Sequence, residues 1–201
     1  MIEINLKSDI IIPFNKIGDN DWDKKSKLII ESLAENWSNE LKAPISIEEI
    51  DNLEKRLGTP LPNGLKTFYK TFGIPDIGEE LQRFEDIIWL KDIWEEDNLY
   101  GPEFSKEDKI SLPHLITFSD YLGNGNMFCF HNETKEIYYF DHDTTPFLTK
   151  MFSNVDDYIK GCLIFAQADL FGEVGQKQVE KWTEEIAEDL FGKSIVRKWR
   201  Y

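Results

Sequence analysis

Cysteine is scarce in this sequence, and long apolar runs are absent. Only Cys129 and Cys162 occur, each within an apolar segment, which predicts two reduced core residues rather than the disulfide framework of a small secreted protein. The longest apolar stretches, such as residues 10–12 and 162–166, are far shorter than the about 20 residues that a membrane-spanning helix needs. Residues 1–14 also lack a basic leader followed by a long apolar core. We therefore expect a soluble, cytoplasmic protein that contacts no membrane.

Basic side chains are also few. The chain has 23 lysines and arginines against 38 aspartates and glutamates, which gives a formal net charge of −15 at pH 7. Such a charge repels phosphate backbones and anionic lipid surfaces, so direct binding to nucleic acid is disfavoured. Hydrophobic residues make up 41% of the 201 positions. This is enough for the chain to bury a core of its own, and we expect one globular unit.

The sequence lacks the short motifs that carry hydrolytic and redox chemistry: it has no Gly-x-Ser-x-Gly elbow, His-Glu-x-x-His helix or Cys-x-x-Cys pair. The one cluster that could ligate a metal or move a proton is Asp141-His142-Asp143, with His131 and His114 in flanking strands. On a strand, the two aspartates would share one face and His142 would point to the other. We interpret the cluster as a polar strand end and predict no metal or cofactor. A metal enzyme that uses His131, Asp141 and His142 is kept as an alternative.

What the sequence does contain is a well-marked pair of helices. Ser46 and Glu49 can form a capping box, and apolar residues then recur at steps of three and four up to Gly58. Pro62 forces the residue before it into an extended conformation, and a second apolar helix follows until Gly73. Short strands are expected at residues 115–119, 127–130 and 137–143, with a hairpin turn at residues 123–126.

Further elements flank this region. Two short strands are expected at residues 2–6 and 10–12, followed by an amphipathic helix over about 24–41. A helix is expected over about 153–170, and another over 176–191 that ends at Gly192. The predicted fold class is α+β: an N-terminal helix pair, a central twisted and mainly antiparallel sheet, and C-terminal helices.

The helix pair and the strands together resemble the SUKH superfamily (Smi/Knr-like), relatives of the yeast cell-wall synthesis regulator. The resemblance rests on residues 47–58, on Leu61-Pro62, on residues 65–73, on the strands and turn within 115–143, and on residues 152–159. It covers about residues 45–172. We accordingly divide the chain into an N-terminal extension (1–44), a SUKH-like domain (45–172) and a C-terminal helical extension (173–201).

The resemblance implies binding rather than catalysis. Bacterial members are mostly immunity proteins that bind and neutralise a cognate toxin, whereas the yeast relative acts as a regulatory scaffold for other proteins. We expect the first role, with a toxin that could be a basic nuclease domain, and keep the scaffold as the alternative.

The predicted binding surface lies in the acidic, aromatic segment 79–109, which contains eleven acidic and four basic residues. Carboxylates there would speed the encounter with a basic toxin, and aromatic side chains could anchor it. The predicted partner-binding residues are Trp89, Trp94, Glu95, Glu96, Asp97, Tyr100 and Glu103. A solvated surface without a partner is the alternative. Near the C-terminus, Trp182, Trp199 and Tyr201 either pack on the core or form a dimer contact, so a monomer or weak homodimer is expected.

Overall fold

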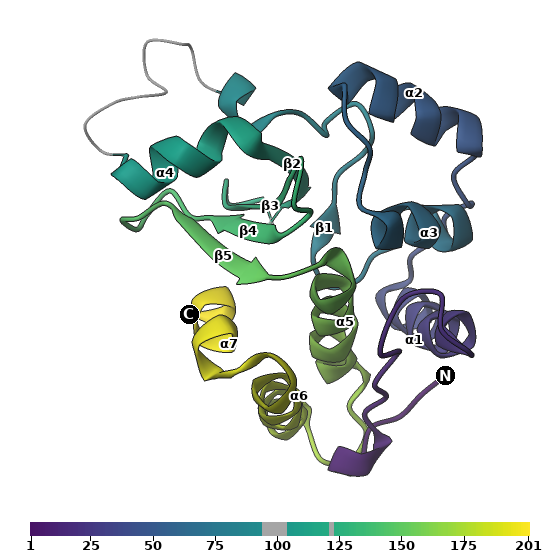
Figure 1. The fold of residues 1–201 in the computed structure, drawn as a ribbon. Helices are drawn as coiled ribbons and strands as arrows, with labels where there is room; N and C mark the ends of the chain where they lie inside the picture. Colours follow the sequence, from purple (N-terminus) through teal and green to yellow (C-terminus); the bar gives the residue numbers. More distant parts are fainter. Residues whose placement is uncertain (94–103, 121–122) are drawn as a thin grey trace.

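The computed structural model describes residues 1–93, 104–120 and 123–201. The first part of the chain is helical (Figure 1). Its elements are η1 (Lys7–Asp9), α1 (Trp22–Trp37), α2 (Ile47–Leu57) and α3 (Asn63–Phe72). The capping box that begins α2 is confirmed: the Glu49 backbone N–H donates to Ser46 Oγ at 3.2 Å, and the Ser46 N–H donates to Glu49 Oε2 at 3.0 Å. Gly73 ends α3 with a φ of 70°, where a Cβ would lie 2.1 Å from the Ala43 carbonyl oxygen.

Five strands form one antiparallel sheet in the order β1-β2-β3-β4-β5, so each strand pairs with its neighbour in sequence. They are β1 (Glu80–Leu81), β2 (Leu115–Asp120), β3 (Met127–His131), β4 (Ile137–Phe140) and β5 (Leu148–Phe152). Between β1 and β2 lie η2 (Leu90–Ile93), α4 (Lys106–Ser111) and η3 (Leu112–His114). The remaining elements are α5 (Val155–Ala166), η4 (Gln167–Leu170), α6 (Gln176–Phe191) and α7 (Lys193–Arg200).

The sheet buries both of its faces. In β3, Phe128 and Phe130 belong to the main core, whereas Cys129, between them, belongs to a second cluster. Alternation along the strand sends these neighbours to opposite faces. The second cluster also contains Phe104 and Leu112, from the connection that carries α4. The apolar side chains of β3 therefore pack into a hydrophobic cluster on each face of the sheet. Both cysteines are free and buried, as predicted.

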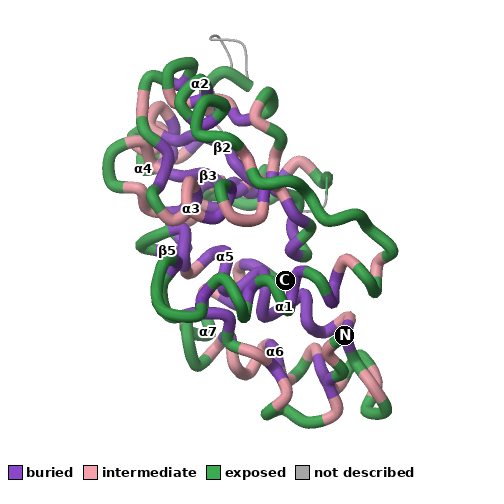
Figure 2. Tube along the Cα trace, turned by 90° about the vertical axis from the view of Figure 1, so that its right-hand side faces the viewer, coloured by how far each residue is buried: buried purple, intermediate pink, exposed green. Residues whose placement is uncertain are grey.

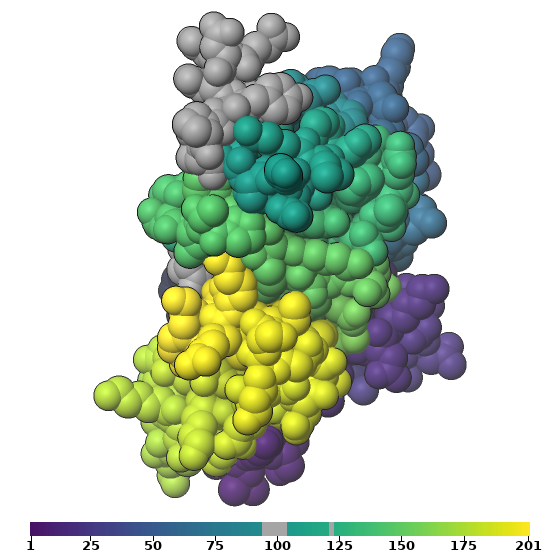
Figure 3. Space-filling model, turned by 60° about the vertical axis from the view of Figure 1, so that its left-hand side comes forward, coloured from purple at the N-terminus to yellow at the C-terminus, as the bar shows by residue number. Residues whose placement is uncertain are grey.

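Helix α5 is the centre of the main core. All of its residues except Asp157 are buried. In Figure 2, α5 is largely purple, the colour of buried residues, and lies between the sheet and helices α6 and α7. Helices α6 and α7 cover the neighbouring surface below the sheet (Figure 3). Trp199 of α7 is 2% exposed, and its ring lies 5.5 Å from that of Tyr158 and 5.2 Å from that of Phe165. The core-packing interpretation of Trp199 is thus confirmed, whereas Tyr201 is exposed.

Three local expectations were wrong. Residues 2–6 and 10–12 form no strands: Ile4 makes an isolated bridge to Phe171, and η1 follows it. Helix α1 ends at Trp37, because Ser38 adopts a left-handed conformation with φ 56°. Strand β4 ends at Phe140, so Asp141, His142 and Asp143 lie in a turn and not on a strand. The edge strands β1 and β5 were not expected from the sequence, and both are short.

Candidate partner-binding site

Trp89 is the one predicted partner-binding residue that the structure describes. It lies just before η2, where it forms an isolated antiparallel bridge with Ile116 of β2. Its indole N–H donates to the Leu57 carbonyl at the end of α2, at 3.2 Å. The ring is half-buried against the main core, and the Lys91 ammonium lies 5.0 Å from the ring centroid. Trp89 thus ties this segment to α2 and to the sheet, and only part of its ring faces outward.

The other six predicted residues lie outside the described part of the chain: Trp94, Glu95, Glu96, Asp97, Tyr100 and Glu103. The prediction that they bind a partner stays a prediction. The described flank of the same segment carries exposed charge at Glu80, Glu85 and Asp86. Arg83 lies 3.3 Å from Asp86 and 3.7 Å from Glu85, so part of this negative charge is neutralised locally.

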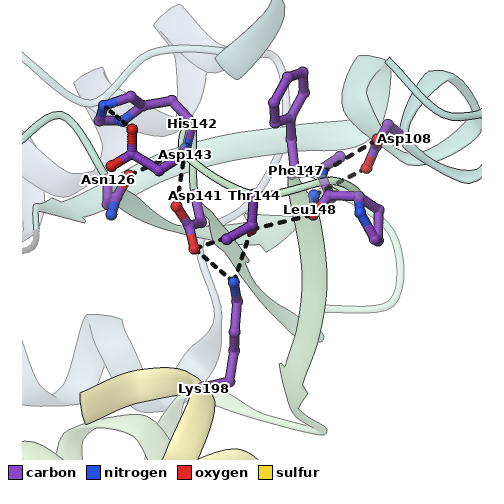
Figure 4. Close-up of polar contacts among 10 residues, drawn as sticks. Asp108, Asn126, Asp141, His142, Asp143, Thr144, Phe147, Leu148 and Lys198 are labelled. Carbon is purple, nitrogen blue, oxygen red and sulfur yellow. Dashed lines mark hydrogen bonds and ion pairs between the residues drawn. The ribbon is translucent and has the colours of Figure 1, made fainter. Parts of the chain in front are cut away.

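Two acidic residues of the segment 79–109 are not on its surface. Asp108 is fully buried, and its carboxylate accepts hydrogen bonds from the backbone N–H groups of Leu148 at 2.9 Å and Phe147 at 3.3 Å (Figure 4). It also accepts the Ser105 N–H in a capping box at the start of α4. Asp108 therefore holds α4 against the beginning of β5. The sequence signals the capping box, as Ser105 followed three residues later by an acid, but it does not signal the contact with β5.

Glu79 is the second buried acid, with an exposed fraction of 6%. Its Oε1 accepts the Trp199 indole N–H at 2.9 Å, while its Oε2 is buried with no hydrogen-bond partner in the described part of the chain. Burial raises the pKa of Glu79 to about 7, although the Trp199 hydrogen bond and the Arg200 charge act in the opposite direction. Glu79 is thus a carboxyl group that titrates near neutral pH inside the protein.

The histidine and aspartate cluster is divided between the two ends of the sheet. Met127 pairs with Phe140 and Phe130 with Ile137, so His131 follows one end of the β3–β4 ladder and His142 the other. Four residues of strand separate these ends, which is on the order of 13 Å. Within residues 1–93, 104–120 and 123–201, no group of three or more His, Cys, Asp or Glu side chains is arranged to hold a metal ion.

At one end, His131 stacks on His114 with ring centroids 5.0 Å apart. Its Nδ1 accepts the backbone N–H groups of Glu133 and Thr134 at 3.2 and 3.3 Å, which is a turn contact. Burial and the neighbouring His114 lower the pKa of His131. This arrangement favours a neutral imidazole that stabilises the turn between β3 and β4.

At the other end, Asp141 organises the turn that contains His142 and Asp143 (Figure 4). Its carboxylate accepts hydrogen bonds from the Asp143 N–H and the Thr144 hydroxyl, both at 3.0 Å, and from the Lys198 ammonium at 2.5 Å. Burial acts to raise the pKa of Asp141, but these three donors outweigh it and hold the pKa below its usual value. The strongest candidate metal ligand is therefore already paired with a lysine of α7.

No helix in the described residues is both long enough and apolar enough to cross a membrane. Residues 44–161 match the SMI1 / KNR4 family (SUKH-1), which is more than half of the chain. A comparison with curated proteins finds no match.

Proposed function

Because the chain belongs to the SMI1/KNR4 family (SUKH-1), we propose that it is a non-catalytic, cytoplasmic immunity protein that binds a cognate protein toxin and prevents it from acting. The observation that carries this proposal is the family match over residues 44–161. The net charge of −15 supports it, because many toxins that act inside cells are nucleases with basic clefts. Opposite charge on the two proteins would speed their encounter.

The proposed toxin-binding surface is the exposed part of segment 79–109. Its described flank presents carboxylates at Glu80, Glu85 and Asp86, and the half-buried Trp89 lies beside them in sequence. The predicted residues between 94 and 103 add four further acids and two aromatic rings. Buried Glu79 and Asp108 do not contribute to this surface.

The test is functional rescue. The chain would be co-expressed with the C-terminal toxin domain of a large protein encoded by the neighbouring gene. We expect growth to be restored and the two proteins to co-purify. A toxin domain that stays fully active in the presence of folded, equally abundant chain would overturn the proposal for that pair.

The surface is tested by association kinetics. Neutralising Glu95, Glu96 and Asp97 together should slow association about tenfold and flatten its dependence on salt, with less effect on dissociation. The matched control neutralises three exposed acids outside the segment: Glu48, Asp51 and Glu173. Truncating Trp94 to alanine should instead raise the dissociation rate if the ring is an anchor. Equal rates for the test and control variants would move the interface elsewhere.

The same family favours a second function, a regulatory scaffold like that of the yeast relative. The two functions differ in the number of partners. Affinity capture from the native host should recover several unrelated proteins for a scaffold and one toxin domain for an immunity protein.

A further inference from the structure

A cavity of about 510 Å³ lies beside Glu79, at the start of segment 79–109. It is lined by the loop before β1, the end of α5, η4, the first turns of α6 and the last residue of α7. Its charged lining is one-sided, with a single cation against five carboxylates. These residues are Arg200 and Asp76, Glu79, Glu80, Asp169 and Glu180. The size is that of a pocket for a small molecule or a large side chain.

Two of the carboxylates in this cavity are held in place by tryptophan N–H groups. The Trp37 indole N–H donates to Asp169 Oδ2 at 2.9 Å, and the Trp199 indole N–H donates to Glu79 Oε1 at 2.9 Å. Among the described residues, none of the five carboxylates is within 4.0 Å of a lysine, arginine or histidine nitrogen. Glu79 lines the cavity, and its Oε2 is buried with no hydrogen-bond partner within residues 1–93, 104–120 and 123–201. A buried acceptor without a donor is costly.

The cavity also has the aromatic walls that suit an organic cation. Trp37 and Phe165 both line it. The guanidinium of Arg200 already lies over the Phe165 ring, 5.1 Å from its centroid, which shows that this wall accommodates a planar cation. Guanidinium groups pair with carboxylates and stack on aromatic faces at the same time.

We propose that this cavity binds an alkylguanidinium or alkylammonium cation, with Glu79 and Asp169 as carboxylate partners and Trp37 as the aromatic wall. Trp37, Phe165, Asp169 and Arg200 all lie outside the region 44–161 that matches the family. Much of the site therefore comes from the segments that flank the family region, whereas Glu79 lies within that region. The experiment below measures cation binding in the absence of a toxin, so its outcome does not depend on the proposed toxin-binding function. An anion is excluded as the ligand, because four or more carboxylates would repel it.

The experiment uses the indole N–H signals of the full-length protein in two-dimensional nuclear magnetic resonance spectra. Trp37 and Trp199 donate to cavity carboxylates, so their indole signals report directly on the site; Trp37→Phe identifies the first of them. The probe is N-acetylarginine amide, and N-acetylcitrulline amide is the neutral control of nearly the same shape. We expect a saturable shift of the Trp37 signal with the arginine probe only.

Glu79→Gln keeps an oxygen that can accept the Trp199 N–H but removes the charge, and it should weaken binding about tenfold. Glu48→Gln removes the same charge on exposed α2 and should leave the affinity unchanged. Equal responses to the arginine and citrulline probes, or equal affinity for the two variants, would overturn the proposal. Comparing the arginine probe with agmatine and spermidine distinguishes two sources of the cation, a protein side chain and a small metabolite. Tighter binding of the arginine probe supports a protein side chain, and tighter binding of the free amines supports a small metabolite.

Discussion

Glu79 provides the sharpest test of the structure, because burial gives it an unusual pKa. The carboxyl group has an ordinary pKa of 4.5 and one of about 7 in the folded protein. Between these values the unfolded chain has released the proton and the folded chain still holds it. The folded state therefore binds more protons there, and the free energy of unfolding falls as the pH rises from about 4.5 to about 7. Above this range the full cost of the buried charge is present.

The magnitude follows from the gap between the two values. Each pKa unit corresponds to about 1.4 kcal/mol, so the ionised Glu79 destabilises the fold by roughly 3 kcal/mol above neutral pH. Glutamine cannot ionise, and its carbonyl oxygen can still accept the Trp199 N–H. Glu79→Gln should therefore match the wild type at about pH 4 and be more stable by about 2–3 kcal/mol at about pH 8.

Urea unfolding followed by tryptophan fluorescence at several pH values measures this difference. The matched control is Glu80→Gln, which removes the neighbouring but exposed carboxylate and should leave the pH profile unchanged. The three histidines titrate in both proteins, so their contribution to the free energy of unfolding cancels when the variant is compared with the wild type. A constant difference between Glu79→Gln and the wild type across the range would refute the reasoning.

The remaining predictions concern α7. Lys198→Met breaks the partly buried pair with Asp141 and should lower the free energy of unfolding by about 1–3 kcal/mol; Lys193→Met, whose contact is exposed and 3.8 Å long, should change it by less than about 0.5 kcal/mol. Trp199→Leu leaves a void among four aromatic rings and should cost about 3 kcal/mol or more. Gly161→Ala places a Cβ 2.6 Å from the Trp199 ring and should cost about 1–3 kcal/mol in the wild type but less in Trp199→Leu. Urea unfolding measures all four, and additive effects of Gly161→Ala and Trp199→Leu would contradict the contact.

The elements set by local chemistry could be predicted from the sequence. The capping box at Ser46, the stop at Gly73 and the full extent of α6 depend on residues within one or two turns, and the structure confirms them. The central strands were also predicted, because apolar runs bounded by turn residues are recognisable locally. The α+β class and the family followed from these elements.

What could not be predicted depends on contacts between distant residues. The sequence places Asp141 at the end of a strand, because nothing near it in sequence indicates a lysine 57 residues away. The charge pattern assigns Glu79 and Asp108 to the acidic surface, because it does not show the distant donors that bury them. Charge patterns in a sequence therefore overestimate the acidic surface and miss the acids that act inside the protein.

The end of α7 contacts both the Asp141 turn and the acidic cavity beside Glu79. Successive helix residues point about 100° apart, and here they reach three different places. Lys198 pairs with Asp141 beside the sheet, Trp199 fills the main core and donates to Glu79, and Arg200 lies over Phe165 at the cavity. A cation that bound in the cavity would stabilise the ionised form of Glu79, which is the same state that the Trp199 N–H stabilises. Binding would therefore offset the cost of the buried carboxylate and strengthen the docking of α7, so the last helix couples occupation of the cavity to the stability of the fold.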